Sequence, residues 1–215
     1  MKIQTIKTAP YVEQNERWPT EGRHILAQYD DESIVVYQAY RPSIGRYAIE
    51  HQRFGGDFKF TRMSWIKPNF LWMMYRCGWA SKEGQGIVLG VRIRREGFES
   101  ILADAVPSSF NRNCFESQEQ WQEAVGQSSV RLQWDPDHDP YGNPVDRRAI
   151  QLGLRDEILR QYATEWVMEI IDMTEFVRQQ YEAVANRKLD ELVTPEEHVY
   201  PVTDSSVARA IGLIR

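Results

Sequence analysis

Two segments of the chain carry the hydrophobic patterns of strands. Residues 33–41 are rich in β-branched and aromatic side chains and stop at Pro42, which has no N–H to donate to a sheet. Residues 86–94 place large apolar residues at every second position. We therefore expect two well-formed strands here, and shorter strands at residues 24–29 and 129–134.

Helical spacing of apolar residues marks the segments between and after these strands. Pro42 can open a helix that runs to about Gln52, and a helix over residues 69–77 would end at Gly78. Residues 167–171 form an apolar run that suits a strand or a helix equally well. Further helices are expected over residues 98–105, 117–125, 175–187 and 206–213. Because strands and helices interleave with short connections, the pattern predicts an α+β domain with a mainly antiparallel sheet and packed helices.

The length of 215 residues and the apolar share of 42% fit a single folded domain with a sizeable core. We expect an N-terminal arm over residues 1–22, a core domain over residues 23–193, and a C-terminal tail over residues 194–215 that packs on the core. Two cysteines are too few for a disulfide framework, and the first residues lack the apolar stretch of a secretion signal. The sequence therefore predicts a cytoplasmic protein, and no apolar run is long enough to cross a membrane.

The net charge of the chain and the motifs that it lacks exclude several classes of protein function. A net charge of −5 excludes a polybasic nucleic-acid or membrane binder for the molecule as a whole, although a local basic patch is left open. The chain has none of the motifs of dinucleotide-binding Rossmann folds, P-loops, zincins or α/β-hydrolases, and its four histidines stand singly. A metalloenzyme or a nucleophilic hydrolase is therefore not expected.

Three aspartates, Asp135, Asp137 and Asp139, resemble the opening of a calcium-binding loop. Pro140 stands where such a loop needs glycine, and Asp146 stands where it needs glutamate. We therefore expect a turn with solvated carboxylates in this segment, and no metal.

The first candidate for chemistry is the end of the strand over residues 33–41, where Tyr40 and Arg41 precede Pro42 and Ser43. An arginine at a strand end presents a fixed fork of donors that suits phosphate or carboxylate, and Ser43 can donate to the same anion. The plainer interpretation is a surface arginine beside a helix that Ser43 caps.

The second candidate is the segment of residues 62–76, in which cations alternate with large aromatic residues. Trp65 and Tyr75 can stack on a base, a nicotinamide or a sugar, while Lys67 and Arg76 can meet phosphates. The alternative is a buried amphipathic helix whose long cations reach out to solvent.

Arg41 and Lys67 both stand at the junction between an extended segment and a helix start, where free N–H groups favour anions. We therefore expect these two side chains to line one concave site that holds a phosphate-bearing ligand. Asn69, at the start of the second helix, is a further candidate binding residue.

Several segments of the chain together resemble an uncharacterised bacterial and fungal family, domain-of-unknown-function family 4291. The resemblance extends over about residues 20–190, and its most specific block is SWIKPNFLWMMYR, which begins at Ser64. It implies that the residues of this block belong to one shared site. The segments that carry it are YQAYRPSIG (37–45), RMSWIKPNFLWMMYR (62–76), GWASKEGQ (78–85), QWDPDHD (133–139) and RRAIQLGLR (147–155).

The sequence Tyr40-Arg41-Pro42-Ser43 also resembles the first motif of arginine-type ADP-ribosyltransferases. This remoter resemblance implies a split antiparallel sheet that binds NAD. Arg41 would then hold the phosphate and ribose region with Ser43 nearby, and Trp65 or Tyr75 would stack on the nicotinamide. The paired glutamates of that superfamily have no counterpart here, so Glu165 and Glu169 are catalytic candidates by position alone.

These features predict an ADP-ribosyltransferase-like protein that binds NAD or a related nucleotide and transfers ADP-ribose to a nucleic acid or a protein. The alternative is a non-catalytic module that binds nucleic acid or a nucleotide on a local basic face, with Trp65 and Tyr75 stacking on bases. The cations of that face would be Arg62, Lys67, Arg76, Arg92 and Arg94.

Overall fold

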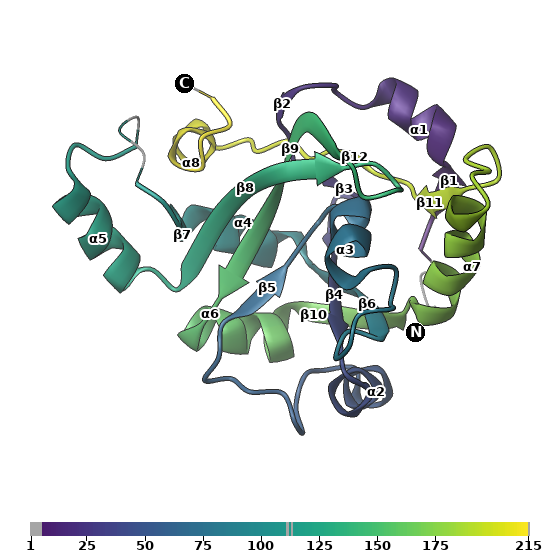
Figure 1. The fold of residues 1–215 in the computed structure, drawn as a ribbon. Coiled ribbons are helices and arrows are strands. Elements are labelled where there is room, and N and C mark those ends of the chain that lie inside the picture. Colours follow the sequence, from purple (N-terminus) through teal and green to yellow (C-terminus); the bar gives the residue numbers. More distant parts are fainter. Residues whose placement is uncertain (1–5, 111, 113, 215) are drawn as a thin grey trace.

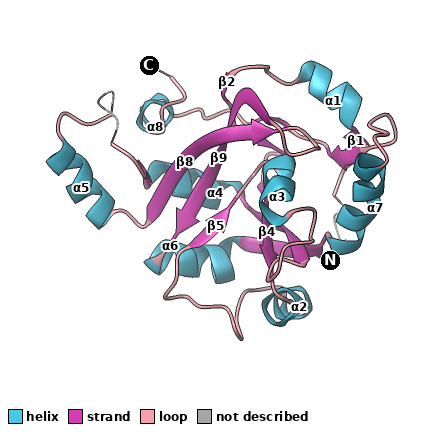
Figure 2. Cartoon of the chain, viewed as in Figure 1, coloured by secondary structure: helices cyan, strands magenta, loops and turns pink. Residues whose placement is uncertain are grey.

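The computed structural model describes residues 6–110, 112 and 114–214, which form eight α-helices, one π-helical turn and twelve strands (Figure 1). Strands and helices interleave along the chain, so the predicted α+β class is confirmed (Figure 2). The strands are β1 (Thr8–Pro10), β2 (Gly22–Arg23), β3 (Leu26–Ala27), β4 (Ser33–Tyr40), β5 (Ser64–Ile66), β6 (Ile87–Arg94), β7 (Ala105–Pro107), β8 (Val130–His138), β9 (Pro144–Leu154), β10 (Val167–Asp172), β11 (Val193–Pro195) and β12 (His198–Val199). The helices are α1 (Tyr11–Arg17), α2 (Pro42–His51), α3 (Phe70–Cys77), α4 (Arg95–Ala103), α5 (Gln118–Gln127), α6 (Asp156–Gln161), the π-helical turn (Tyr162–Trp166), α7 (Thr174–Ala185) and α8 (Ser205–Ala210).

Two sheets make up the centre of the molecule. One has three antiparallel strands in the order β10-β6-β4. The other has the order β2-β9-β8-β7 with β5 paired to β9, and its long β8–β9 hairpin curves across the molecule (Figure 1). Most pairings are antiparallel, as predicted, and the pairs β2–β9 and β7–β8 are parallel.

The short strand β5 joins the two sheets. It pairs with the C-terminal end of β9, where Trp65 lies directly across from Gly153. Lys67, the first residue after β5, pairs with β4 of the other sheet. The N–H of Tyr37 in β4 donates to the carbonyl of Lys67 at 2.7 Å, and the N–H of Lys67 donates to the carbonyl of Tyr37 at 3.3 Å. The sheet is therefore split into two parts, and residues 64–67 lie where the parts meet.

Strand β4 supplies side chains to two hydrophobic cores, because successive residues of a strand point to opposite faces. Ile34 and Val36 belong to the core that β6, β8, β9 and α4 complete. Val35 and Tyr37 belong to the second core, which α3 and α7 cover. Gln38 continues the alternation of Ile34 and Val36, so a buried polar side chain enters the region between the two sheets.

Strand β8 is longer than expected. It runs to His138 and pairs with β9 through Pro136, so the predicted turn begins only at Asp139, which accepts hydrogen bonds from two backbone N–H groups. Asp137 lies inside the strand, buried, with an ion pair of 2.7 Å to Arg147 of β9. The expectation of solvated carboxylates is therefore wrong for Asp137, because its partner on the neighbouring strand permits burial.

Helices α2 and α3 follow the predicted boundaries closely. Pro42 is the first residue of α2, and Gly78 ends α3 with a φ of 58°, a left-handed conformation that favours glycine. The ambiguous run of residues 167–171 is part of a strand, because it pairs with β6.

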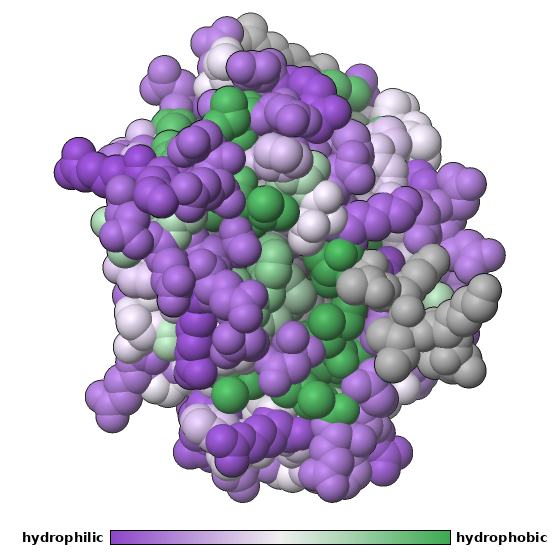
Figure 3. Space-filling model, turned by 90° about the vertical axis from the view of Figure 1, so that its right-hand side faces the viewer, coloured by the Kyte–Doolittle hydropathy of each residue, from purple (hydrophilic) through white to green (hydrophobic). Residues whose placement is uncertain are grey.

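The segments near the two ends of the chain pair with each other and with the core. β1 pairs with β11, β12 pairs with β3, and the indole of Trp18 donates to the carbonyl of Glu197 at 2.9 Å. Figure 3 shows the side of the molecule on which α1 and α7 lie, where hydrophilic residues surround a band of hydrophobic ones. No helix in the described part of the chain is long and apolar enough to cross a membrane.

Candidate functional site

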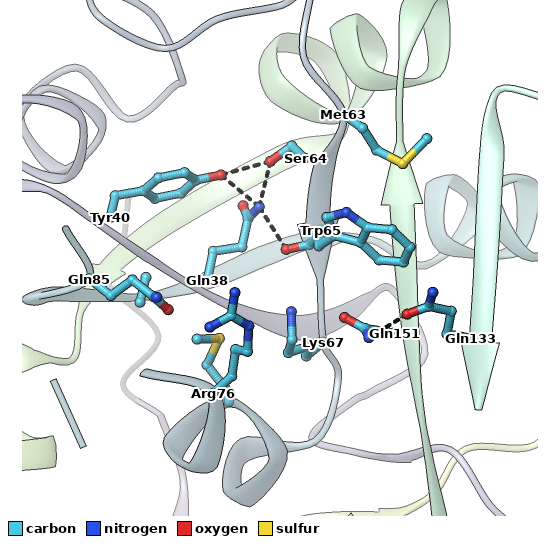
Figure 4. Close-up of a pocket in the computed structure, with 12 residues that line it drawn as sticks. Gln38, Tyr40, Met63, Ser64, Trp65, Lys67, Arg76, Gln85, Gln133 and Gln151 are labelled. Carbon is cyan, nitrogen blue, oxygen red and sulfur yellow. Dashed lines mark hydrogen bonds between the residues drawn. The ribbon is translucent and has the colours of Figure 1, made fainter. Parts of the chain in front are cut away.

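A cavity of about 410 Å³ opens where the two sheets meet. β4, β5, α3 and the β8–β9 hairpin contribute its walls (Figure 4). Its lining is mainly polar, with four glutamines, two cations and one indole. These residues are Gln38, Gln85, Gln133, Gln151, Lys67, Arg76 and Trp65.

Lys67 is the most unusual residue of the cavity. It directly follows β5, its backbone is fixed by Tyr37, and its side chain is only 4% exposed with the amine directed into the cavity (Figure 4). Among the described residues, no hydrogen bond or ion pair satisfies this amine, and the ring of Trp72 lies 5.5 Å from it. Burial and the positive charge of Arg76 lower the pKa of Lys67 from 10.5 to about 8, against an opposing effect of Asp135.

The second cation, Arg76, comes from the last turn of α3, and its side chain extends into the cavity beside that of Lys67 (Figure 4). The ends of α3 determine where Arg76 lies. Asn69 caps the helix, because its Oδ1 accepts a hydrogen bond from the N–H of Trp72 at 2.7 Å, and Gly78 ends it. Asn69 is buried and lies outside the cavity lining, so it positions the helix that carries the cation.

A network of hydroxyl and amide groups forms the wall opposite these cations (Figure 4). The Nε2 of Gln38 donates to the hydroxyls of Tyr40 and Ser64 at 2.7 and 2.9 Å, and the hydroxyl of Tyr162 donates to its Oε1 at 2.7 Å. Burial raises the pKa of Tyr40 well above its usual range, so its hydroxyl stays protonated at neutral pH. The predicted residue Tyr40 therefore lies on the cavity as a fixed hydroxyl group.

Two glutamines on the hairpin complete the polar lining. The Nε2 of Gln151 donates to the Oε1 of Gln133 and to the Oδ2 of Asp135, both at 2.7 Å. Within residues 6–110, 112 and 114–214, the amide N–H groups of Gln133 and the carbonyl of Gln151 have no hydrogen-bond partner. The cavity therefore offers both a donor and an acceptor to a ligand.

Trp65 reaches the cavity because it faces a glycine. A Cβ atom on Gly153 would lie 2.9 Å from the indole and 2.6 Å from the sulfur of Met63. Since glycine leaves this space empty, both side chains lie across β9 at the cavity wall (Figure 4). The half-buried indole lines the cavity, and its stacking role stays a prediction.

Arg41 lies on a neighbouring hollow of about 390 Å³, together with Lys59 and Arg62. The two hollows share Tyr40 and Ser64 as a common wall, so Arg41 and Lys67 line adjoining sites and not one concave site. Arg41 is half-exposed and forms an ion pair of 3.0 Å with Asp57.

Ser43 and Tyr75 lie away from the cavity. Ser43 is exposed in the first turn of α2, and it does not cap this helix, whose N-cap residue is Arg41. Tyr75 is exposed on α3 and stacks on His138, with 3.5 Å between the ring centroids.

Neither candidate glutamate lies on the cavity. Glu165 is exposed in the π-helical turn and lines a separate hollow. Glu169 pairs at 3.5 Å with Arg92 across β10 and β6. Arg92 is in register with Val35, and Gln38 points to the opposite face of the sheet, so strand alternation turns Glu169 away from the cavity.

The basic face expected from five cations is not one surface. Arg92 and Lys67 are buried, with 6% and 4% of their surface exposed, whereas Arg62, Arg76 and Arg94 are exposed. Arg92 lies beside Glu169, and Lys67 lies inside the cavity.

The glutamines of the cavity were not predicted from the sequence. Gln38, Gln133 and Gln151 belong to three different strands, which only the folded sheets bring together. A signal did exist, because Gln38 is an uncharged polar residue inside a strand that is otherwise almost entirely apolar.

No functionally curated protein matches the chain. The family described as Domain of unknown function (DUF4291) matches residues 24–200, a range that includes every residue of the cavity lining. The match covers most of the 215 residues, so the chain belongs to this family, as its sequence blocks predicted.

Proposed function

We propose that the cavity binds a phosphorylated nucleotide of the NAD class. The observation that carries this proposal is the buried amine of Lys67, which lies near Arg76 and has no hydrogen-bond or ion-pair partner in the described part of the chain. A buried cation without a counter-charge costs free energy, and the phosphates of a nucleotide supply that charge. The same pair of cations would also hold the ligand in a defined orientation.

The remaining lining supports a nucleotide over a simple anion. Trp65 presents an aromatic face for a base or a nicotinamide. Gln133 and Gln151 present to its polar edge a donor and an acceptor that no described residue satisfies. A volume of about 410 Å³ lies in the range of small-molecule sites.

The adjoining hollow supports a dinucleotide over a mononucleotide. Arg41, Lys59 and Arg62 surround it, and it meets the cavity at Tyr40 and Ser64. A ligand with two nucleoside halves can occupy both hollows, with its pyrophosphate between the two groups of cations. Arg41 would then contact a phosphate, as the remoter resemblance implies.

Transfer of ADP-ribose is the reaction class that fits an NAD ligand. It requires a carboxylate that stabilises the cationic ribose while nicotinamide leaves. Asp135 takes this part in the proposal: it lines an adjoining hollow that shares Gln133 with the cavity, and it accepts a hydrogen bond from Gln151 of the cavity wall. The change Asp135→Asn is then expected to stop nicotinamide release while the affinity for NAD stays within a few-fold.

A nucleic acid strand is the second candidate ligand. The observation that favours it is the exposure of Arg41, Lys59 and Arg62, which continue the row of cations out of the cavity. A strand that follows these cations would bind with a steep dependence on salt concentration.

A ligand screen by thermal shift tests the proposed function. NAD, ADP-ribose and AMP at millimolar concentration are expected to raise the melting temperature, with the two dinucleotides giving larger shifts than AMP. Inorganic sulfate at the same ionic strength is the control for a general anion effect. A panel in which no nucleotide gives a shift beyond that of sulfate would refute the proposal.

A further inference from the structure

The surroundings of Lys67 have a second chemical consequence. An amine attacks a carbonyl group only when it carries a free electron pair, and exposed lysines are almost entirely protonated at neutral pH. Lys67 differs from them in three geometric respects: it is 4% exposed, it faces a guanidinium, and its amine points into an open cavity (Figure 4). Burial beside another cation is an arrangement that activates lysine as a nucleophile.

Neighbouring groups have opposing effects on the protonation of Lys67. Arg76 on α3 opposes protonation, while Asp135 on β8 and the thiol of Cys77 favour it less strongly. With a pKa of about 8, roughly a tenth of the Lys67 side chains carry a neutral amine at pH 7.

We propose that Lys67 is an amine nucleophile that forms an imine with a phosphorylated aldose in its open-chain form. Arg76 would hold the phosphate group, and Lys67 would meet the aldehyde carbon at the other end of the ligand. This inference does not depend on nucleotide binding. It also covers ADP-ribose, whose terminal ribose opens to an aldehyde, but not NAD, which has no free aldehyde.

The step balances without an oxidant or a reductant. The electron pair of the neutral amine forms a bond to the carbonyl carbon, and the carbonyl oxygen takes up the proton that the nitrogen loses. The hydroxyl group then leaves with a second proton as water, which produces the C=N bond. Tyr40, whose hydroxyl contacts Gln38 and Ser64 on the opposite wall, would pass a proton to the leaving hydroxyl and take back the second proton of the nitrogen, so that the imine, water and a neutral Tyr40 remain.

Other lysines of the chain serve as internal controls. The amine of Lys82 donates to the carbonyls of Tyr75 and Arg76, and Lys188 forms an exposed ion pair of 2.8 Å with Glu191. The hydrogen bond to Glu191 raises the pKa of the Lys188 amine, so this amine stays protonated at neutral pH.

Reductive trapping tests the inference on the wild-type chain. The protein is incubated at pH 7 with ribose 5-phosphate and sodium cyanoborohydride, and modified lysines are located by peptide mass mapping over time. We expect Lys67 to be modified at least tenfold faster than Lys188. Ribose without phosphate should react several-fold more slowly at Lys67, and Arg76→Gln should remove this difference between the two sugars.

The results separate this inference from the proposed function. Equal modification of Lys67 and Lys188, or an unmodified Lys67, would overturn the inference and leave nucleotide binding untouched. Selective modification of Lys67 in a protein that binds no nucleotide would support the inference and refute the proposed function. Protection of Lys67 by NAD would link the two, because both ligands would then occupy one cavity.

Discussion

At the scale of single residues, Lys67 makes the stability of the protein depend on pH. Its folded-state pKa of about 8 lies below its ordinary value of 10.5, so the unfolded chain binds this proton more tightly. The free energy of unfolding is therefore expected to rise between pH 8 and pH 10.5 through this residue. The full effect is on the order of 3 kcal/mol.

Replacement of the amine by an apolar group measures this effect. Lys67→Met is expected to stabilise the protein at pH 7 by about 1–3 kcal/mol, because a buried charge is removed. This advantage over the wild type should shrink as the pH rises toward 10.5. Urea denaturation at several pH values checks the prediction, with Lys59→Met as the exposed control. A loss of stability at pH 7 in Lys67→Met would contradict it.

At the scale of elements, Glu197 anchors the first turn of α3, the helix that carries Arg76. Its buried carboxylate accepts a hydrogen bond from the N–H of Phe70 at 2.7 Å, and burial raises its pKa well above the ordinary value of 4.5. Because the folded chain binds this proton more tightly, the residue contributes less to stability as the pH rises above 4.5.

Two substitutions at this position separate the hydrogen bond from the charge. Glu197→Gln keeps an acceptor for Phe70 and removes the charge, so we expect stability at pH 7 to be equal to or higher than that of the wild type. Glu197→Ala leaves a buried N–H unpaired and should cost about 2 kcal/mol or more. Thermal denaturation of both variants checks this, and equal losses would contradict it.

The contact between β5 and β9 depends on Gly153. A Cβ atom there would lie within 3.0 Å of the side chains of Trp65 and Met63, so Gly153→Ala should displace the indole from the cavity wall. We expect a loss of about 1–3 kcal/mol in stability and at least a tenfold loss in nucleotide affinity.

A matched glycine provides the control for this substitution. Gly126, near the end of α5, has nothing within 4 Å of the position of an added Cβ, so Gly126→Ala should keep or slightly raise the stability. Denaturation and ligand titration are compared for the two variants. Nucleotide affinity that is unchanged in Gly153→Ala would show that Trp65 takes no part in binding.

The elements that local sequence defines were predicted well. Pro42 and Gly78 mark the start of α2 and the end of α3 through backbone chemistry that acts locally. The C-terminal half of β8 was missed, since Asp137 can lie in a strand only because Arg147 pairs with it from β9. The candidate glutamate Glu169 was likewise proposed from its position along the chain, whereas the face that it occupies depends on its register with β6.

Only those cavity residues that stand out within a single segment of the sequence were predicted. Tyr40, Trp65, Lys67 and Arg76 come from two segments that were recognised as unusual in composition. The glutamines Gln38, Gln133 and Gln151 come from strands of two different sheets, and no pattern within any one segment reveals that these strands meet at the cavity.

At the scale of the whole molecule, the net charge of −5 repels an anionic ligand, whereas the cations of the two hollows attract it. A dinucleotide should lose affinity only several-fold between 50 and 200 mM salt, because its pyrophosphate offers only two phosphates to the cations. A nucleic acid strand with 6–10 phosphate contacts would lose about 10³–10⁵-fold in the same range. Binding measured at both salt concentrations for NAD and for a short RNA separates the two candidates.

Isothermal titration with ADP-ribose tests most directly whether the Lys67 cavity is a nucleotide site. The account predicts saturable binding of one ligand per chain, at least tenfold weaker in Lys67→Met and unchanged in Lys188→Met. Both variants remove one lysine, but only the first changes the cavity, so the comparison isolates the buried amine. Equal affinity in the wild type and Lys67→Met, or no binding to the wild type at millimolar concentration, would contradict the account.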